Sequence, residues 1–299
     1  MKTILFALPG NEELAQLLAG HMNAELGDAT IRRFPDGESY TKINSEIKGC
    51  CVVVICTLHQ PDDKLLPLYF LCKTAMELGA ACTCLVVPYL AYMRQDKQFQ
   101  PGEGVTSTYF GQLISGFANT LTTVDPHLHR RSALSEIYTV PNKVVHAAPH
   151  ISKWVSQNIE NPVFIGPDSE SEQWVSDVAQ DAGAPFIVLE KVRHGDRDVE
   201  VSVPDVEKYK THTPVLVDDI ISTARTMIET VGHLKKAGMK PPVCVGIHPV
   251  FAGSAFEDLK HAGVEQIITC NTIPHESNQI DLSDILAEEV QALMKHYAH

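Results

Sequence analysis

The stretch Val215-Leu-Val-Asp-Asp-Ile-Ile-Ser-Thr-Ala-Arg-Thr226 decides how this chain is expected to fold. Three apolar residues predict a buried strand, which carries Asp218 and Asp219 at its carboxyl end. A loop rich in hydroxyls follows, and a helix is predicted over Thr223–Ala237. Ligands of open α/β sheets bind at this end of the strands, and the start of a helix suits a phosphate. The stretch therefore predicts an α/β protein with a phosphate-binding loop.

The rest of the chain repeats this alternation of strand and helix. The strand-like runs are apolar almost throughout, as expected for strands buried on both faces of a parallel sheet. They are Thr3–Leu8, Val52–Thr57, Cys82–Pro88, Leu121–Val124, Val163–Gly166, Phe186–Leu189, Pro214–Val217, Val243–His248 and Gln266–Cys270. Amphipathic stretches between them predict helices over Glu12–Met22, Pro61–Leu78 and Pro149–Asn158.

Two domains are expected, since 299 residues exceed one ordinary domain. The turn-rich segment near Lys143–Pro149 places the boundary between residues 1–145 and residues 146–299. Each half contains a strand that ends on an acidic residue, Val124-Asp125 and Val217-Asp218. The last predicted helix, 283–296, has one apolar side and could pack back on the N-terminal domain.

Composition limits the classes of function. A net charge of −13 argues against a nucleic-acid partner or an anionic membrane surface, both of which attract basic proteins. The N-terminal apolar run is too short for a signal peptide, and no run approaches a membrane span. A cytoplasmic protein is expected. The eight cysteines lie mostly in apolar runs and form no C-x-x-C pair, so buried thiols are favoured over a zinc site or a redox motif.

The loop around Asp218 resembles the phosphoribosyl-diphosphate loop shared by type I phosphoribosyltransferases and ribose-phosphate pyrophosphokinases. Four further segments resemble only the pyrophosphokinases (5-phosphoribosyl 1-diphosphate synthases): Arg32–Tyr40, Val87–Lys97, Thr123–His129 and Leu189–Arg197. The resemblance covers nearly the whole chain. It implies two phosphoribosyltransferase-like domains, each with a mostly parallel sheet flanked by helices, and an enzyme that makes 5-phosphoribosyl 1-diphosphate and AMP from ribose 5-phosphate and Mg-ATP.

The same resemblance assigns the ATP site. Phe34 would pack on the adenine, mainly from a neighbouring subunit, and Asp36 and Glu38 would hydrogen-bond around it. Arg94 and Gln95 would contact ATP. His127 would lie at the ATP phosphates and the magnesium ion, together with Asp168 as a second metal-associated residue. A site shared in this way implies a homo-oligomer.

The resemblance also assigns the sugar site and the catalytic groups. Asp218 and Asp219 would hold the ring hydroxyls of ribose 5-phosphate, and its 5-phosphate would lie in the loop formed by Ser222, Thr223, Ala224, Arg225 and Thr226. Lys191 and Arg193 would come from a mobile flap. On an extended strand they project from one face and could neutralise charge on the transferring group.

Three alternatives stay open. The family loop usually carries glycine where this chain has Arg225, and one form of it also has glycine at the position of Ala224. The turn after Asp168 is unusually acidic. Arg225 and the acidic turn favour a non-catalytic regulatory homologue, against which Lys191 and Arg193 speak, and Arg225 also leaves open a pyrophosphokinase for another pentose phosphate. A phosphoribosyltransferase would not need the segments around Phe34 and Arg94.

Overall fold

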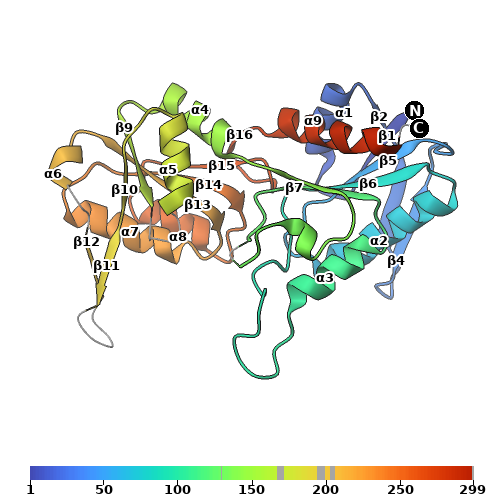
Figure 1. Cartoon of the computed structure of the whole chain (residues 1–299), viewed down its shortest axis with the longest axis horizontal. Coiled ribbons are helices and arrows are strands. Elements are labelled where there is room, and N and C mark those ends of the chain that lie inside the picture. The colour runs from blue at the N-terminus through green and yellow to red at the C-terminus, as the bar shows by residue number, and fades with distance from the viewer. Residues whose placement is uncertain (129, 167–171, 194–198, 203–205, 298–299) are drawn as a thin grey trace. The chain divides into compact units, whose positions relative to one another are not determined.

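A computed structural model describes the whole chain except residues 129, 167–171, 194–198, 203–205 and 298–299. It divides into two compact units (Figure 1). Unit 1 comprises Met1–Val145, Thr272–Pro274 and Leu282–His299, and unit 2 comprises His146–Asn271 and His275–Asp281. The C-terminal helix α9 (Ser283–Met294) thus belongs to the same unit as the N-terminal residues.

Unit 1 is built on a six-stranded sheet in which neighbouring strands run parallel. Its order is β2-β1-β5-β6-β7-β8, formed by β2 (Glu25–Leu26), β1 (Thr3–Ala7), β5 (Cys51–Ile55), β6 (Cys82–Val87), β7 (Thr120–Val124) and β8 (Asn142–Val145). Every residue of β5, β6 and β7 is buried. This burial explains why β5 and β6 are nearly continuous apolar runs, whereas β7 also buries three threonines.

Helices cover both faces of this sheet (Figure 1). The helices α2 (Asp62–Glu77) and α3 (Thr106–Ser115) pack with one face of the strands in a single hydrophobic core. The helix α1 (Glu12–Met22) contacts α9, and α9 also contacts β6, β7 and β8. A short 3-10 turn, η1 (Leu134–Glu136), precedes β8, and another, η2 (Lys295–Tyr297), follows α9.

Unit 2 has a second six-stranded parallel sheet, ordered β10-β9-β13-β14-β15-β16. Its strands are β10 (Phe186–Val188), β9 (Pro162–Gly166), β13 (Thr213–Ile221), β14 (Val243–Pro249), β15 (Gln266–Cys270) and β16 (Asn278–Ile280). Its helices are α4 (Ala148–Asn158), α5 (Glu172–Asp181), α6 (Val206–Tyr209), α7 (Arg225–Lys236) and α8 (Ala255–His261).

The two units repeat one topology. Counted in chain order, the sheet strands of each unit are arranged 2-1-3-4-5-6. Between its second and third sheet strands each unit also inserts an antiparallel ribbon: β3 (Ala29–Arg33) with β4 (Ser39–Ile43) in unit 1, and β11 (Glu190–Arg193) with β12 (Val199–Ser202) in unit 2. The segments around Phe34 and Lys191 therefore occupy equivalent places in the two units.

The predicted fold class is confirmed: two α/β domains with parallel sheets flanked by helices. Each of the nine strand-like runs forms a strand, and one of these strands is much longer than expected. β13 does not end before the aspartates and continues to Ile221, because Ile220 and Ile221 are buried and pair with His248 and Pro249. The sequence analysis did not predict the strands β2, β8 and β16 or the helices α3, α5, α6 and α8.

The expectation of eight buried thiols is wrong for two of them. Cys51 and Cys82 form a disulfide between β5 and β6, and the other six cysteines are free and buried. The parallel register sets these two residues side by side at the starts of adjacent strands, which spacing along the chain did not reveal.

Among the described residues, no helix combines the length and the apolar character that crossing a bilayer would require.

Candidate functional site

The acidic end of β13 is held in a fixed register beside β14. Asp218 lies opposite Gly246, and both Asp218 and Asp219 are partly exposed in the carboxyl-terminal half of the strand. The backbone N–H of Asp219 donates to Oδ1 of Asp218 at 3.0 Å. A side chain at Gly246 would collide with Ile221, since an added Cβ would lie 2.5 Å from Cδ1 of that residue. Glycine here therefore allows the strand to continue past the aspartates.

The loop after β13 leads directly into α7. Ala224 is the N-cap residue and has a left-handed backbone with φ +56°, a conformation that normally favours glycine. No side chain caps the first turn of α7. Its N–H groups and the positive end of the helix dipole are therefore suited to an anion. Ser222, Thr223 and Thr226 supply hydroxyls around this turn, and Arg225 is its exposed first residue.

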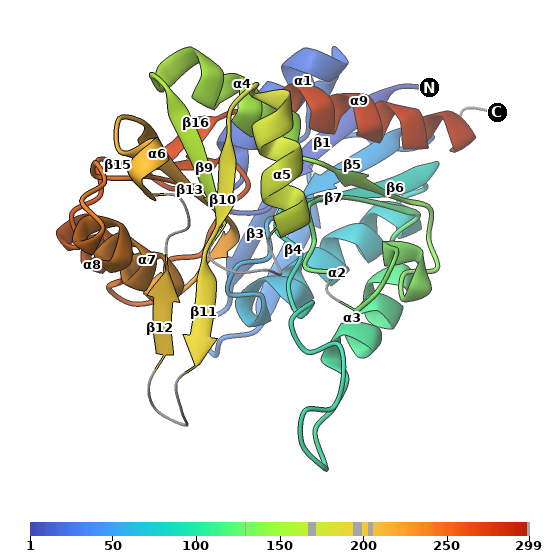
Figure 2. The same ribbon diagram turned by 60° about the vertical axis from the view of Figure 1, so that its left-hand side comes forward.

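The ribbon that carries Lys191 and Arg193 starts at the same edge of the sheet. β11 continues from the end of β10 and pairs with β12 beyond the sheet (Figure 2). β9 alone separates β10 from β13, and all three strands run parallel, so the base of the ribbon and Asp218 lie at one sheet edge. Lys191 and Arg193 alternate with Val192 in β11. Asp168 lies outside the described residues.

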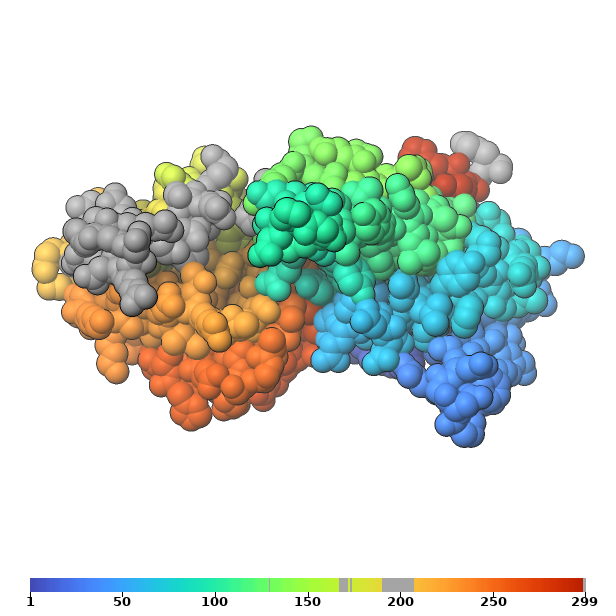
Figure 3. Space-filling view, turned by 90° about the horizontal axis from the view of Figure 1, so that it is seen from below, coloured from blue at the N-terminus to red at the C-terminus, as the bar shows by residue number. Residues whose placement is uncertain are grey.

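In unit 1, Phe34 lies at the tip of the β3–β4 ribbon, which projects from the surface (blue in Figure 3). The turn is closed by the N–H of Phe34 donating to the carbonyl of Glu38 at 2.8 Å, and Gly37 has φ +94°. The Phe34 ring is 38% exposed, and the Arg32 guanidinium lies 4.7 Å from its centroid. Asp36 and Glu38 are also exposed. The turn thus presents one aromatic ring and two carboxylates to the outside.

Arg94 and Gln95 lie on the loop between β6 and α3, which Figure 3 shows in teal at the surface of unit 1. Arg94 is exposed. The carbonyl of Gln95 accepts from the N–H of Ser107 at 3.3 Å, which fixes the loop against the start of α3. The neighbouring Asp96 is nearly buried and pairs with Arg130 at 2.9 Å. The exposed charges of this run are therefore those of Arg94 and Lys97.

His127 follows β7, and its loop meets the loop of Arg94. β6 and β7 are parallel neighbours, so both loops leave the same sheet edge. The ion pair between Asp96 and Arg130 joins them directly. The structure thus brings the Arg94, Gln95 and His127 segments together.

The first turn of α2 connects these loops to the ribbon of Phe34. Asp63 accepts from Arg33 at 2.6 Å, and Asp62 accepts from the hydroxyl of Tyr92. Burial is the larger cause and the contact with Asp62 the smaller one, and together they raise the pKa of Tyr92 to about 12. The sequence did not predict that Asp62 and Asp63 contact Tyr92 and Arg33, because two acidic residues in a first helical turn are common without such contacts.

A second polar cluster lies at the end of β5. Lys64 donates to the carbonyl of Thr57 and to Nδ1 of His59, both at 2.9 Å. Burial lowers the pKa of Lys64. Burial and the charge of Lys64 lower the pKa of His59. These contacts favour a neutral His59 with its proton on Nε2, in a segment for which the sequence predicted no role.

Comparison with known proteins identifies the family. Residues 3–117 match the model for the N-terminal domain of ribose phosphate pyrophosphokinase, and residues 133–284 match the phosphoribosyl transferase domain. The ribose-phosphate pyrophosphokinase of Methanopyrus kandleri is 32% identical over 97% of this chain and 99% of its own length. That of Sulfolobus acidocaldarius is 32% identical over 92% of this chain and 93% of its own. The chain belongs to the ribose-phosphate pyrophosphokinase family.

The fold agrees with this assignment. The crystal structure of phosphoribosylpyrophosphate synthetase from Mycobacterium smegmatis covers 99% of this chain with a TM-score of 0.86, at 23% identity. The family predicted from sequence is therefore confirmed over both units. In this member of the family, Ala224 adopts a left-handed backbone at a position where one form of the family loop carries glycine.

Proposed function

We propose that this chain transfers the β,γ-diphosphoryl group of ATP to the C1 hydroxyl of ribose 5-phosphate, giving 5-phosphoribosyl 1-diphosphate and AMP. One observation carries the proposal: an acidic strand end, an uncapped helix start and the base of a ribbon with two cations share one edge of the unit 2 sheet. A sugar phosphate needs these features together, with acceptors for its hydroxyls and donors for its phosphate.

The sugar is bound by the end of β13 and the loop after it. The 5-phosphate accepts hydrogen bonds from the first-turn amides of α7 and from the hydroxyls of Ser222, Thr223 and Thr226, and Arg225 adds a positive charge. Asp218 and Asp219 accept hydrogen bonds from the ring hydroxyls. This binding fixes the position of the C1 oxygen, and positioning supplies much of the catalysis in phosphoryl transfer.

ATP is bound by Arg94, Gln95 and His127 of one subunit and by Phe34, Asp36 and Glu38 of a neighbour. The exposed Phe34 on a projecting turn supports this division, because an aromatic ring at such a place gains by stacking on a base. The proposal therefore includes a homo-oligomer.

In the reaction, the C1 oxygen attacks the β-phosphorus and its proton passes to solvent, the bond from that phosphorus to the oxygen of the α-phosphate breaks, and AMP leaves. Lys191 and Arg193 neutralise charge on the transferring group. The resemblance implies magnesium, which would screen the phosphate charges. The donors present fit it: Asp218 and Asp219 offer partly exposed carboxylate oxygens, the ligands that magnesium prefers. His127 offers nitrogen, and it fits better as a partner of ATP phosphate, with Asp168 as a further carboxylate.

Phosphorus NMR of the purified chain with ATP, magnesium and ribose 5-phosphate tests the proposal. We expect signals of AMP and of a pyrophosphoryl group on C1. Lys191→Ala and Arg193→Ala should each lower kcat by about 10²- to 10³-fold, the range for removing a preorganised charge-stabilising donor. Lys208→Ala, which removes an exposed lysine of α6, is the control and should retain full activity.

A second candidate is a non-catalytic homologue that regulates an active partner. The strained Ala224 and the bulky Arg225 at the phosphate loop favour it. It predicts that the pure chain binds ribose 5-phosphate without forming AMP, so the same NMR experiment distinguishes the two candidates. A pentose phosphate panel in that assay tests sugar specificity.

A further inference from the structure

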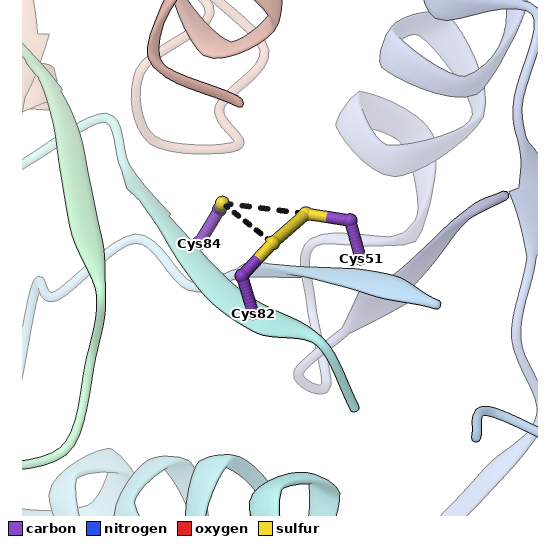
Figure 4. A group of neighbouring side chains, drawn as sticks. All are labelled: Cys51, Cys82 and Cys84. Atoms are coloured by element: carbon purple, nitrogen blue, oxygen red, sulfur yellow. Dashed lines mark hydrogen bonds between the residues drawn. A yellow bond between two sulfur atoms is a disulfide. The ribbon is translucent and has the colours of Figure 1, made fainter. Parts of the chain in front are cut away.

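Three sulfur atoms meet inside unit 1, away from the segments assigned above (Figure 4). Cys51 and Cys82 form a disulfide, and Sγ of Cys84 lies 3.6 Å from Sγ of Cys51 and 4.0 Å from Sγ of Cys82. All three side chains are at most 2% exposed. Isolated buried cysteines behave as small apolar residues, but three together form a donor set.

The sheet geometry holds this cluster in place. Cys51 and Cys82 are register partners at the first positions of the parallel neighbours β5 and β6. Cys84 comes two residues after Cys82, so strand alternation directs both side chains to the same face. The three sulfurs are thus fixed by the most buried strands of unit 1, and no loop has to order to bring them together.

The cluster lies close to the end of the chain. Burial, and then the charge of Cys84, raise the pKa of Tyr297 in η2. The hydroxyl of Tyr297 donates to the carbonyl of Asn119 at 3.0 Å, and η2 itself buries no side chain. Tyr297 therefore lies within electrostatic reach of Cys84.

The spacing of the sulfurs suits one metal ion. With metal–thiolate bonds of about 2.3 Å, as for zinc, an ion in the plane of three sulfurs sets them about 4 Å apart. The two non-bonded separations, 3.6 and 4.0 Å, already lie near this value. Only the sulfurs of Cys51 and Cys82, which are bonded to each other, would have to move apart. Three thiolates are soft ligands, and soft ligands select Cu(I), zinc or iron–sulfur clusters.

The number of ligands separates these ions. Among the described residues the group contains three cysteines and no fourth histidine, cysteine or carboxylate. Structural zinc takes four ligands in nearly every case, and iron–sulfur clusters also need four. Cu(I) accepts three thiolates in a plane.

We propose that the chain with its Cys51–Cys82 disulfide reduced binds one Cu(I) ion through Cys51, Cys82 and Cys84. Reduction takes two electrons and two protons and gives two thiols, and a phosphine supplies the electrons while water supplies the protons and the oxygen of the phosphine oxide. The Cu(I) ion then replaces thiol protons, which pass to the buffer. Neither step depends on ATP or ribose 5-phosphate.

Anaerobic transfer of Cu(I) from its coloured bicinchoninate complex tests the proposal, in the presence of a phosphine that reduces the disulfide. We expect the wild-type chain to remove one equivalent of copper. Cys84→Ala should weaken binding at least ten-fold. Cys72→Ala is the matched control, since Cys72 is a fully buried free thiol of α2 in the same unit, and it should bind like the wild type. The chain kept oxidised should take up none.

X-ray absorption of the copper-loaded wild type gives a second measurement that does not depend on how the variants fold. We expect three sulfur neighbours at one distance. The proposal is overturned if the reduced wild type takes up no copper, if Cys84→Ala or the oxidised chain binds equally well, or if only two sulfurs surround the ion.

Discussion

At the scale of single residues, Ala224 links backbone conformation to the candidate phosphate loop. A left-handed backbone costs a residue with a Cβ roughly 1–2 kcal/mol, and glycine escapes this cost. Ala224 nevertheless adopts this left-handed backbone, with φ +56°.

We therefore predict that Ala224→Gly is more stable than Ala237→Gly by about 1–2 kcal/mol. Ala237 is the matched control, because it caps the other end of α7 with an ordinary helical backbone. Both substitutions raise the conformational entropy of the unfolded chain equally. The difference between the two free energies of unfolding therefore measures the backbone strain at Ala224. Urea unfolding measures it, and equal stabilities would show that Ala224 is unstrained.

Tyr92 gives a prediction about pH. Its pKa is raised to about 12 by burial and by Asp62, above the ordinary value of 10. A raised folded-state pKa favours the protonated phenol in the folded chain, so the contribution to stability is complete below pH 10 and is lost as pH rises through 12. The absorbance titration curve of Tyr92→Phe, subtracted from that of the wild type, leaves the ionisation of Tyr92 alone. We expect the midpoint of this difference curve well above pH 10. A midpoint at 10 would contradict the contact with Asp62.

At the scale of elements, the two ribbons occupy equivalent places in the two units but carry different side chains. The β3–β4 ribbon presents an exposed Phe34 and two carboxylates, and β11 contains two cations. The same topology thus places two ribbons with different side chains. We propose that the β3–β4 ribbon binds a base and that the β11–β12 ribbon neutralises phosphate charge.

Phe34→Ala should raise KM for ATP by about 5- to 150-fold, because stacking of a base on an aromatic ring contributes roughly 1–3 kcal/mol. KM for ribose 5-phosphate and the unfolding midpoint should change little, since Phe34 is exposed. Phe70→Ala, on α2, is the control with nearly the same exposure, 37% against 38%. If both variants bind ATP equally well, Phe34 has no special role. Steady-state kinetics with each substrate varied in turn makes the comparison.

At the scale of the whole molecule, the chain closes unit 1 with its last helix. α9 packs on α1, β7 and β8, which are separated from it by more than a hundred residues. His21 of α1 hydrogen-bonds Ser283 at 3.1 Å, and Lys143 pairs with Glu289 at 3.2 Å. Unit 1 therefore cannot complete its core until the whole chain is present.

Leu286→Ala should destabilise unit 1 by about 2–5 kcal/mol, since Leu286 is 1% exposed and a cavity would replace it. Amide hydrogen exchange should accelerate in β7 and β8 and stay unchanged in β13 and β14 of unit 2. Leu17→Ala on α1, where the side chain is 38% exposed, serves as the control and should cost less than about 1 kcal/mol. Equal acceleration in both sheets would contradict an independent unit 1.

The sequence alone predicted the fold class, nine of the twelve strands of the two large sheets and the family. It could do so because buried parallel strands and the loops at their carboxyl ends are encoded by neighbouring residues. The stretch from Val215 to Thr226 contains strand, carboxylates and helix start in order, so it could be interpreted alone. It could not show that Asp63 pairs with Arg33, that Asp96 pairs with Arg130, or that Cys51 meets Cys82 and Cys84. These ion pairs and the cysteine cluster depend on the tertiary structure, because strand order and register determine which distant side chains become neighbours.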